Sequence, residues 1–345
     1  MTDSASVVGA PPRAAEGRTR PLNRAWLALL LLSALALPFL AGSYALFMAT
    51  QLMIFAIAVI GLNLVVVNGG QISLGHGAFF AAGAYIMALL LNQTPLPHVL
   101  VVVIAGLLCF GAGWLFAKPA LRLSGPYLAL ATFALAVTTP QFLKLEALRQ
   151  YTGGSQGLSV TTPFFANRAG ITFEQWLYWL SLLVVVLAFV LARNITVGRT
   201  GRAIAAVREH PIAASAMGVP IARYSTALFA VSAALAGVAG SLAALLTQFV
   251  SPDSFSVLLS MSFIVACITG GSVGIAGPML GAAFIVLAPN VVEKINPSAP
   301  GALYGVLLIL CAIFLPQGAS GSLRLGFARI RQHLLRARSN NDEFT

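Results

Sequence analysis

The sequence predicts an all-helical protein that crosses a membrane many times, and three observations support this fold class. Of the 345 residues, 59% are hydrophobic and only 8% are charged, whereas about a quarter of the residues in a soluble globular protein are charged. The apolar residues form runs long enough to cross a bilayer. Basic residues gather between these runs rather than along one polar face. We therefore expect an all-α, polytopic transmembrane helical bundle.

Ten apolar runs are predicted as membrane spans. A full crossing needs about 20 residues, and fewer where a short or broken helix is shielded by protein. The two short late runs, Val257–Gly270 and Pro278–Pro289, are equally compatible with one broken hairpin. The ten runs are Ala25–Ala41, Tyr44–Val67, His76–Leu91, Val99–Ala117, Pro126–Leu143, Gln175–Ala192, Tyr224–Thr247, Val257–Gly270, Pro278–Pro289 and Gly301–Leu315.

The basic residues predict the orientation of these spans. With the N-terminus inside, sixteen of the 20 lysines and arginines fall on the inner side, as the positive-inside rule requires. Both termini are then cytoplasmic in a multi-pass membrane protein. The expected organisation is a disordered N-terminal tail (1–24), a transmembrane domain (25–320) and a basic C-terminal tail (321–345). The net charge of +11 favours anionic lipid over nucleic acid as a partner.

One long polar loop, 193–223, interrupts the apolar chain. It carries five arginines against one acid, Glu209, and burying several arginines in lipid is too costly, so the loop must lie in water. Two short helices are predicted, Gly201–Glu209 and Ile212–Met217. Pro211 breaks the first and begins the second, and Gly218 ends the second. The loop is either a positive anchor or a docking element that receives force from a cytoplasmic partner.

A second polar stretch, 68–77, lies between two apolar runs. Polar groups at membrane depth must find partners in protein or line a wet cavity. The stretch is therefore either a broken helix beside a translocation path or an aqueous turn. With Asn63 before the break, the candidate path residues are Asn63, Gln71, Ser73 and His76. His76 has no nearby carboxylate or second histidine, which favours a structural, hydrogen-bonded side chain over a metal ligand.

Two further segments leave alternatives open. The stretch 270–281 contains five glycines and lacks the Gly-Lys-Ser/Thr ending of a phosphate loop. Gly277 and Gly281 form a GxxxG motif that suits close helix packing, and the remaining glycines permit a re-entrant bend. The alternative role of this stretch is to expose its backbone to a solute. The external connection 144–174 contains YTGGSQGLSV and is either an ordinary loop or part of a gate or a docking face for an external solute receptor.

The sequence contains no pattern that predicts a catalytic, metal-binding or cofactor-binding site. The three cysteines lack paired spacing, so no disulfide framework or metal site is expected, and no cofactor or catalytic residue is predicted. The acidic residues fall in loops or at span ends rather than inside spans, unlike those of ion-coupled carriers. The energy for any transport is therefore expected from a separate polypeptide.

Several stretches, taken in order, resemble the permease family of branched-chain amino acid ABC importers, of the LivM type. They are GLNLVVVNGGQISLGHGAFFAAGAY, SGPYLALATFAL, TGGSQGL, GRAIAAVREHPIAASAMGV and SPDSFSVLLSM with GGSVGIAGPMLGAA. The resemblance implies a transport subunit that works with a LivH-type second permease, two cytoplasmic ATPases and a periplasmic solute-binding protein.

The same resemblance identifies the ATPase-coupling positions as Arg202, Glu209, Ala213, Ala214 and Gly218. The glutamate of the "EAA" pattern is replaced by Ile212, and His210-Pro211 stands where such loops often have Asn-Glu. The expected solute is a branched-chain or related amino acid, with urea or a short amide as the alternative. A stand-alone channel or secondary carrier built on the 68–77 break is the other hypothesis.

Overall fold

The computed structural model describes residues 33–123, 125–161, 171–271, 276–295, 305–306 and 310. It divides into two units, 1–42 and 43–345. In the first unit, residues 33–40 are helical and belong to the predicted span Ala25–Ala41. The predicted tails 1–24 and 321–345, and most of the predicted span Gly301–Leu315, lie outside the described residues. The second unit contains both polar stretches.

The described part of the second unit is almost entirely helical, as predicted. Its α-helices are α2 (Ser43–Asn63), α3 (His76–Gln93), α4 (His98–Ala120), α5 (Pro126–Leu143), α6 (Arg149–Thr152), α7 (Phe173–Thr196), α8 (Arg199–Glu209), α9 (Pro211–Ala216), α10 (Ile221–Thr247), α11 (Val257–Gly270) and α12 (Ala276–Ile295). A π-helical turn, η1 (Leu64–Asn68), continues α2. Three 3₁₀ turns are η2 (Glu146–Leu148), η3 (Gly154–Gln156) and η4 (Pro252–Phe255). The departure from an all-α chain is one antiparallel pair of two-residue strands, β1 (Leu158–Ser159) and β2 (Phe249–Val250).

Within the described residues, five helices are long and apolar enough to cross a bilayer: α2 with η1, α4, α5, α7 and α10. α11 and the 277–289 part of α12 are apolar but shorter. Helices lie over eight of the predicted runs, and the bounds of α5 and α11 are those expected from the sequence. Several helix ends differ, because apolar runs end before the helix does: α12, for instance, continues through Pro289 to Ile295.

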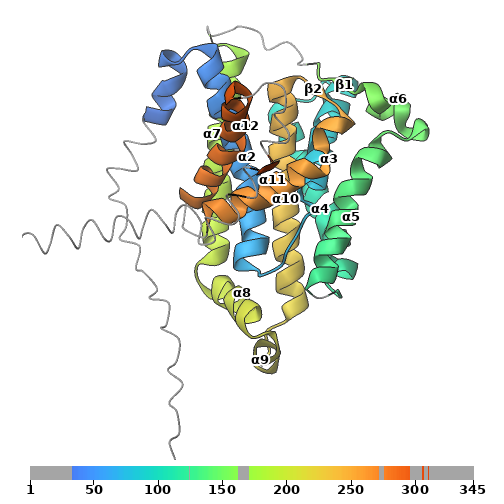
Figure 1. Cartoon of the computed structure of the whole chain (residues 1–345), viewed down its shortest axis with the longest axis vertical. Coiled ribbons are helices and arrows are strands. Elements are labelled where there is room, and N and C mark those ends of the chain that lie inside the picture. The colour runs from blue at the N-terminus through green and yellow to red at the C-terminus, as the bar shows by residue number, and fades with distance from the viewer. Residues whose placement is uncertain are drawn as a thin grey trace, which may run out of the picture. The chain divides into compact units, whose positions relative to one another are not determined.

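α10 is the central helix of the bundle and packs against α2, α3 and α4 (Figure 1). Small residues allow this closeness. A Cβ added at Gly83 of α3 would lie 1.9 Å from the carbonyl oxygen of Gly237 in α10, and one added at Gly113 of α4 would lie 2.5 Å from the Cβ of Ala233. Apolar helices in lipid gain association energy from such close backbone packing. The small-residue faces of α3, α4 and α10 therefore hold the centre of the bundle together.

α11 and α12 are two separate helices packed side by side, with residues 272–275 between them outside the described part. A Cβ added at Gly281 would lie 2.2 Å from the carbonyl oxygen of Ala266, and one at Gly277 would lie 2.5 Å from that of Gly271. The GxxxG glycines thus face α11, which confirms the close-packing interpretation. α11 and α12 therefore form a tight helical pair.

Two ends of the second unit carry most of its non-helical or short elements. At one end, α8 and α9 extend beyond α7 and α10, and we call this the α8–α9 end (Figure 1). At the opposite end lie α6, β1 and β2, and we call this the β1–β2 end. The first end contains the polar loop that the sequence analysis singled out, and the second contains the described residues, 144–161 and 171–174, of the glycine-rich connection.

Candidate coupling loop and polar break

The predicted loop 193–223 is shorter than expected, because its two ends are helical. Arg193 lies in the last turn of α7 and Arg223 in the first turn of α10. Between them, Gly198 turns the chain with φ of 91°, a value that favours glycine. α8 and α9 then follow in the order predicted, with Pro211 at the first turn of α9. The loop is a pair of short helices joined at His210.

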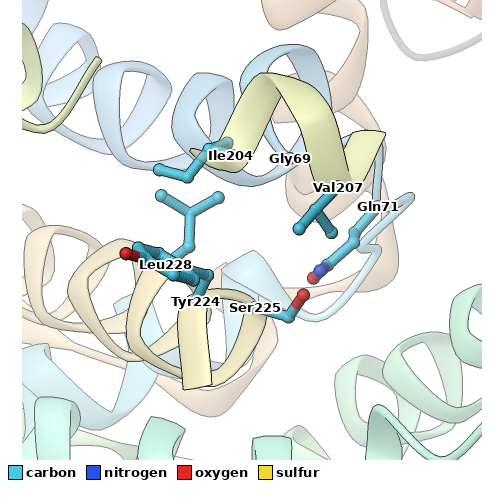
Figure 2. Close-up of a pocket in the computed structure, with 7 residues that line it drawn as sticks. All are labelled: Gly69, Gln71, Ile204, Val207, Tyr224, Ser225 and Leu228. Atoms are coloured by element: carbon cyan, nitrogen blue, oxygen red, sulfur yellow. The ribbon is translucent and has the colours of Figure 1, made fainter. Parts of the chain in front are cut away.

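α8 is amphipathic and rests on the bundle through its apolar side. Ile204 is only 5% exposed, and Ile204 and Val207 cover a small cavity whose other wall is formed by α10 and the chain after η1 (Figure 2). The arginines of α8 are exposed. The remaining lining residues are Gly69, Gln71, Tyr224, Ser225 and Leu228. The apolar side of α8 therefore contacts the bundle, while its arginine side chains remain largely exposed.

α9 is closed by a Schellman cap centred on Gly218. The Gly218 amide donates to the Ser215 carbonyl at 3.0 Å, and the Val219 amide donates to the Ala214 carbonyl at 3.0 Å. This pair of bonds needs a residue in the left-handed region, and Gly218 has φ of 80°. A Cβ at Gly218 would meet nothing within 4 Å. The glycine is thus required by backbone conformation and not by crowding within this chain.

The outer surface of the α8–α9 end combines apolar and charged side chains. Ile212 is 85% exposed and Met217 is 84% exposed. The predicted coupling residues Arg202, Glu209 and Ala213 are exposed as well, whereas Ala214 is buried against the bundle. Among the described residues, neither recorded ion pair involves this surface. Large apolar side chains fully in water are typical of an interaction site.

Asn63 and His76 are buried on either side of the break and use their polar atoms within the bundle. The amide nitrogen of Asn63 donates to the Gly271 carbonyl at the end of α11 (3.2 Å). His76, which is 3% exposed, pairs its Nε2 with the Ala58 carbonyl at 2.9 Å. Its ring meets Phe263 edge-on. The structural, hydrogen-bonded histidine predicted from the sequence agrees with these contacts.

The other two candidate path residues lie apart from this pair. Ser73 is buried. Gln71 lines the cavity beneath α8, where its Oε1 is buried without a hydrogen-bond partner among the described residues. Figure 2 shows the Gln71 amide and the Ser225 hydroxyl directed toward each other. Of the four candidates, Gln71 thus lines this cavity, whereas Asn63 and His76 form hydrogen bonds within the bundle.

Arg208 is a functional candidate that sequence reasoning listed only as one of five loop cations. Its guanidinium donates to the carbonyl oxygen of Val67, the fourth residue of η1. Its side-chain stem covers Gly70, whose added Cβ would lie 3.0 Å from Arg208 Cγ. The two polar stretches are thus in direct contact, although 141 residues separate these partners. Sequence spacing carries no signal of such a contact.

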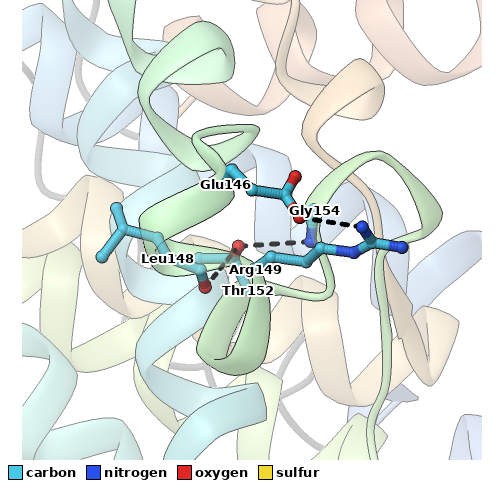
Figure 3. Close-up of polar contacts among 5 residues, drawn as sticks. All are labelled: Glu146, Leu148, Arg149, Thr152 and Gly154. Atoms are coloured by element: carbon cyan, nitrogen blue, oxygen red, sulfur yellow. Dashed lines mark hydrogen bonds and ion pairs between the residues drawn. The ribbon is translucent and has the colours of Figure 1, made fainter.

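The β1–β2 end is cross-braced by side chains and backbone. Asn92 at the end of α3 donates to the Ser159 carbonyl and accepts from both the amide and the hydroxyl of Thr161. Figure 3 shows Thr152 donating to the Leu148 carbonyl and accepting from the Gly154 amide, beside the Arg149–Glu146 ion pair. The segment 152–161 is therefore an ordered clasp.

A larger cavity, of about 480 Å³, opens between α2, α11 and α12. It was not predicted. Its lining is mostly apolar, with the Gln51 amide and the Ser262 hydroxyl among the lining residues, which are Phe47, Met48, Gln51, Phe55, Leu258, Leu259, Ser262, Ile285, Val286 and Pro289. In the part of the chain that the structure describes, no group of three or more potential metal ligands occurs. The cavity suits a small, largely apolar molecule.

Comparison with known proteins agrees with this architecture. Residues 44–312 match the family model described as branched-chain amino acid transport system / permease component. The chain is 32% identical over 321 residues to the LivM permease proteins of high-affinity branched-chain amino acid transport from Salmonella typhimurium and Escherichia coli. Each alignment covers 86% of this chain and 74% of the relative. A probable LivH permease of Methanocaldococcus jannaschii is 25% identical over 76% of this chain and 87% of its own length. No solved structure matches.

The family model covers most of the chain, including both polar stretches and the α11–α12 pair. The resemblance stated from the sequence motifs is thereby confirmed. We conclude that the chain belongs to the family of permease components of branched-chain amino acid ABC transport systems, as a LivM-type, non-catalytic membrane subunit.

Proposed function

We propose that this permease carries branched-chain or related amino acids across the bacterial inner membrane, driven by two separate ATPase subunits that dock at the α8–α9 end. The observation that carries the proposal is the exposed apolar tip of that end, Ile212 and Met217, together with the exposed charged residues Arg202 and Glu209 of α8. Apolar anchors rimmed by charged groups are typical of the centre of a protein interface.

The proposed coupling residues have distinct roles in this interface. Arg202 and Glu209 are exposed and available to polar groups of an ATPase. Ala213 is an exposed small residue that admits close approach, and Ala214 anchors α9 on the bundle. Gly218 sets the direction in which the chain leaves α9. A movement of the ATPases would thus push on a capped helix that is fixed to the membrane part.

The orientation follows from this docking. If the α8–α9 end meets cytoplasmic ATPases, the β1–β2 end faces the periplasm and a solute-binding protein, and both termini are cytoplasmic across about ten spans. A LivH-type second permease would cover part of the apolar surface, on which the exposed side chains of α4 and α5 include Leu107, Leu115, Tyr127 and Leu130. The remaining apolar surface would contact lipid.

The solute is proposed from the family and from the larger cavity. The lining between α2, α11 and α12 is mainly aliphatic and aromatic, which suits a branched aliphatic side chain better than the fully polar urea. The amino and carboxylate groups of the solute would need further polar partners, which a second permease could supply. Asn63, Gln71, Ser73 and His76 remain the proposed path residues nearer the α8–α9 end.

Reconstitution tests the function. In proteoliposomes that contain this chain, a LivH-type permease, the two ATPases and the solute-binding protein, we expect ATP-dependent uptake of radiolabelled leucine. The matched control omits only the ATPases and should show no uptake. Leucine flux through this chain alone would instead support a channel or secondary carrier, and ATP-dependent uptake of urea but not leucine would overturn the amino acid assignment.

A further inference from the structure

η1 lies between the proposed coupling loop and the glycine-rich α11–α12 pair, and it is held from both sides. On one side Arg208 of α8 donates to the Val67 carbonyl. On the other side Asn63, the residue before η1, donates its side-chain amide to the Gly271 carbonyl at 3.2 Å. Asn68 closes the turn by donating to the Asn63 carbonyl at 3.2 Å. A continuous set of polar contacts therefore runs from α8 to the end of α11.

The chemistry of the Arg208 contact suits a lasting connection. Val67 is in the last turn of a helix, where carbonyl groups lack partners within the helix and where the helix dipole favours a cation. A charged donor forms a stronger hydrogen bond than a neutral one. Gly70 has φ of 67° and no side chain, so the stem of Arg208 lies directly on the backbone. The contact combines charge, hydrogen bonding and packing.

The local structure of η1 suits an element with two arrangements. A π-helical turn is rare and is often found at functional positions. Here the Gly69 amide donates to the Leu64 carbonyl at 2.9 Å, and the Gln71 amide donates to the Val65 carbonyl at 3.0 Å. A change in pitch at this turn would shift Asn63, the last residue of α2, and with it the hydrogen bond to Gly271.

We propose that η1, held by Arg208 at one end and by Asn63 at the other, transmits the movement of α8 to Gly271 at the end of α11. Arg208 and Asn63 are then positioning residues for transport, and the inference rests on the proposed ATPase docking. A contact between residues does not by itself show that they are energetically coupled. The tests must therefore measure how Arg208 and Asn63 affect each other's contribution to transport.

The first test uses the reconstituted transporter and measures the ratio of leucine taken up to ATP hydrolysed. Both rates are corrected for the amount of assembled complex. Arg208→Ala should lower this ratio by about 2- to 30-fold, the range for residues that carry coupling, and Arg208→Lys should restore part of it through its single ammonium donor. Arg199→Ala is the matched control, because it removes an exposed arginine from the same helix. A role in stability alone would reduce the amount of complex and leave the ratio unchanged.

The second test replaces the Arg208 contact with a covalent one. The Cβ positions of residues 70 and 208 would lie 3.7 Å apart, within the range of disulfides. In the double variant Gly70→Cys/Arg208→Cys, the ratio of leucine uptake to ATP hydrolysis should be low when the cysteines are reduced. It should return toward the wild-type ratio when they are oxidised to a disulfide. The single variants, treated in the same way, should not respond. If oxidation instead blocks uptake and reduction restores it, the contact must open during transport and the proposal is wrong.

A double-mutant cycle completes the test. If η1 connects the two contacts, Asn63→Ala and Arg208→Ala should together lower the ratio by less than the product of their separate effects. Independent effects, or an Arg208→Ala ratio equal to that of Arg199→Ala, would overturn this inference alone. A wild-type complex without ATP-dependent uptake would overturn the proposed function and this inference with it.

Discussion

The two ends of the bundle are built differently. The β1–β2 end is a firmly bonded structural element, whereas the α8–α9 end is a contact surface that can move. The β1–β2 end is tied by a strand pair, two ion pairs and the three hydrogen bonds of Asn92. Among the described residues, the α8–α9 end is tied by apolar contacts of Ile204 and Val207 and by the Arg208 hydrogen bond. Fewer ties leave α8 and α9 able to respond to a partner.

The exposed side chains differ in the same sense. At the α8–α9 end the large apolar side chains of Ile212 and Met217 are exposed, and no described residue covers them. At the β1–β2 end the backbone is occupied with its own turns, which Gly153, Gly154 and Gly157 permit through positive φ values. A partner that binds the α8–α9 end would gain affinity by burying apolar side chains. A partner that binds the β1–β2 end would depend more on shape complementarity.

The largest expected effect comes from placing charge on the apolar tip. Ile212→Asp or Met217→Asp should each cost about 2 kcal/mol of ATPase binding, or about thirtyfold in affinity, as for central interface residues. Copurification of the ATPases and titration of their activity would measure this. Because both side chains are exposed, the thermal stability of the isolated permease should not change. Ile212→Leu is the control and should bind normally.

A result in which Ile212→Asp and Met217→Asp bind the ATPases normally would remove the functional distinction between the two ends.

Labelling provides an independent check of orientation. A cysteine introduced at Met217 should react with a membrane-impermeant maleimide in inside-out vesicles and not in intact spheroplasts. Labelling in intact spheroplasts would place the α8–α9 end outside and contradict ATPase docking there.

A smaller effect is expected from Gly218, where the substitution changes only backbone preference. Gly218→Ala should cost about 1 kcal/mol in the stability of the α9 cap, because an L-residue disfavours the left-handed region. Gly218→Val should cost more, and Gly218→Asn less, since asparagine tolerates this conformation. We expect uptake per ATP to fall in the order Asn, Ala, Val. Equal uptake in all three variants would show that the exit angle of α9 does not affect coupling.

Much of the fold was predictable because it depends on local patterns. Apolar runs marked eight of the observed helices, and Pro211 and Gly218 marked the turns around α9. The β1–β2 pairing was missed, since it joins residues about 90 positions apart through two-residue strands that leave no alternating pattern. The bounds of loop 193–223 were too wide because arginines occur in the end turns of α7 and α10.

The candidate site was less predictable than the fold. The sequence analysis chose polar residues near the break as one group, but the helical geometry directs Asn63 to Gly271 and His76 to Ala58. It included Arg208 only as a contributor to net charge, because the acceptor is a main-chain carbonyl that no residue type reveals. The lining of the larger cavity comes from α2 and from the α11–α12 pair, which are far from α2 in the sequence, and an apolar run alone cannot distinguish such residues from those facing lipid.

The smallest effect is expected at the β1–β2 end, where one tie among several is removed. Asn92→Ala would lose three hydrogen bonds, all at exposed positions, and should cost about 1 kcal/mol in stability because water replaces the lost partners. Thermal unfolding in detergent would measure this, and leucine uptake should stay within about twofold of wild type, since the strand pair still holds the clasp. A tenfold loss of uptake at normal stability would instead mean that the clasp itself acts in transport, and the two ends would then no longer differ in kind.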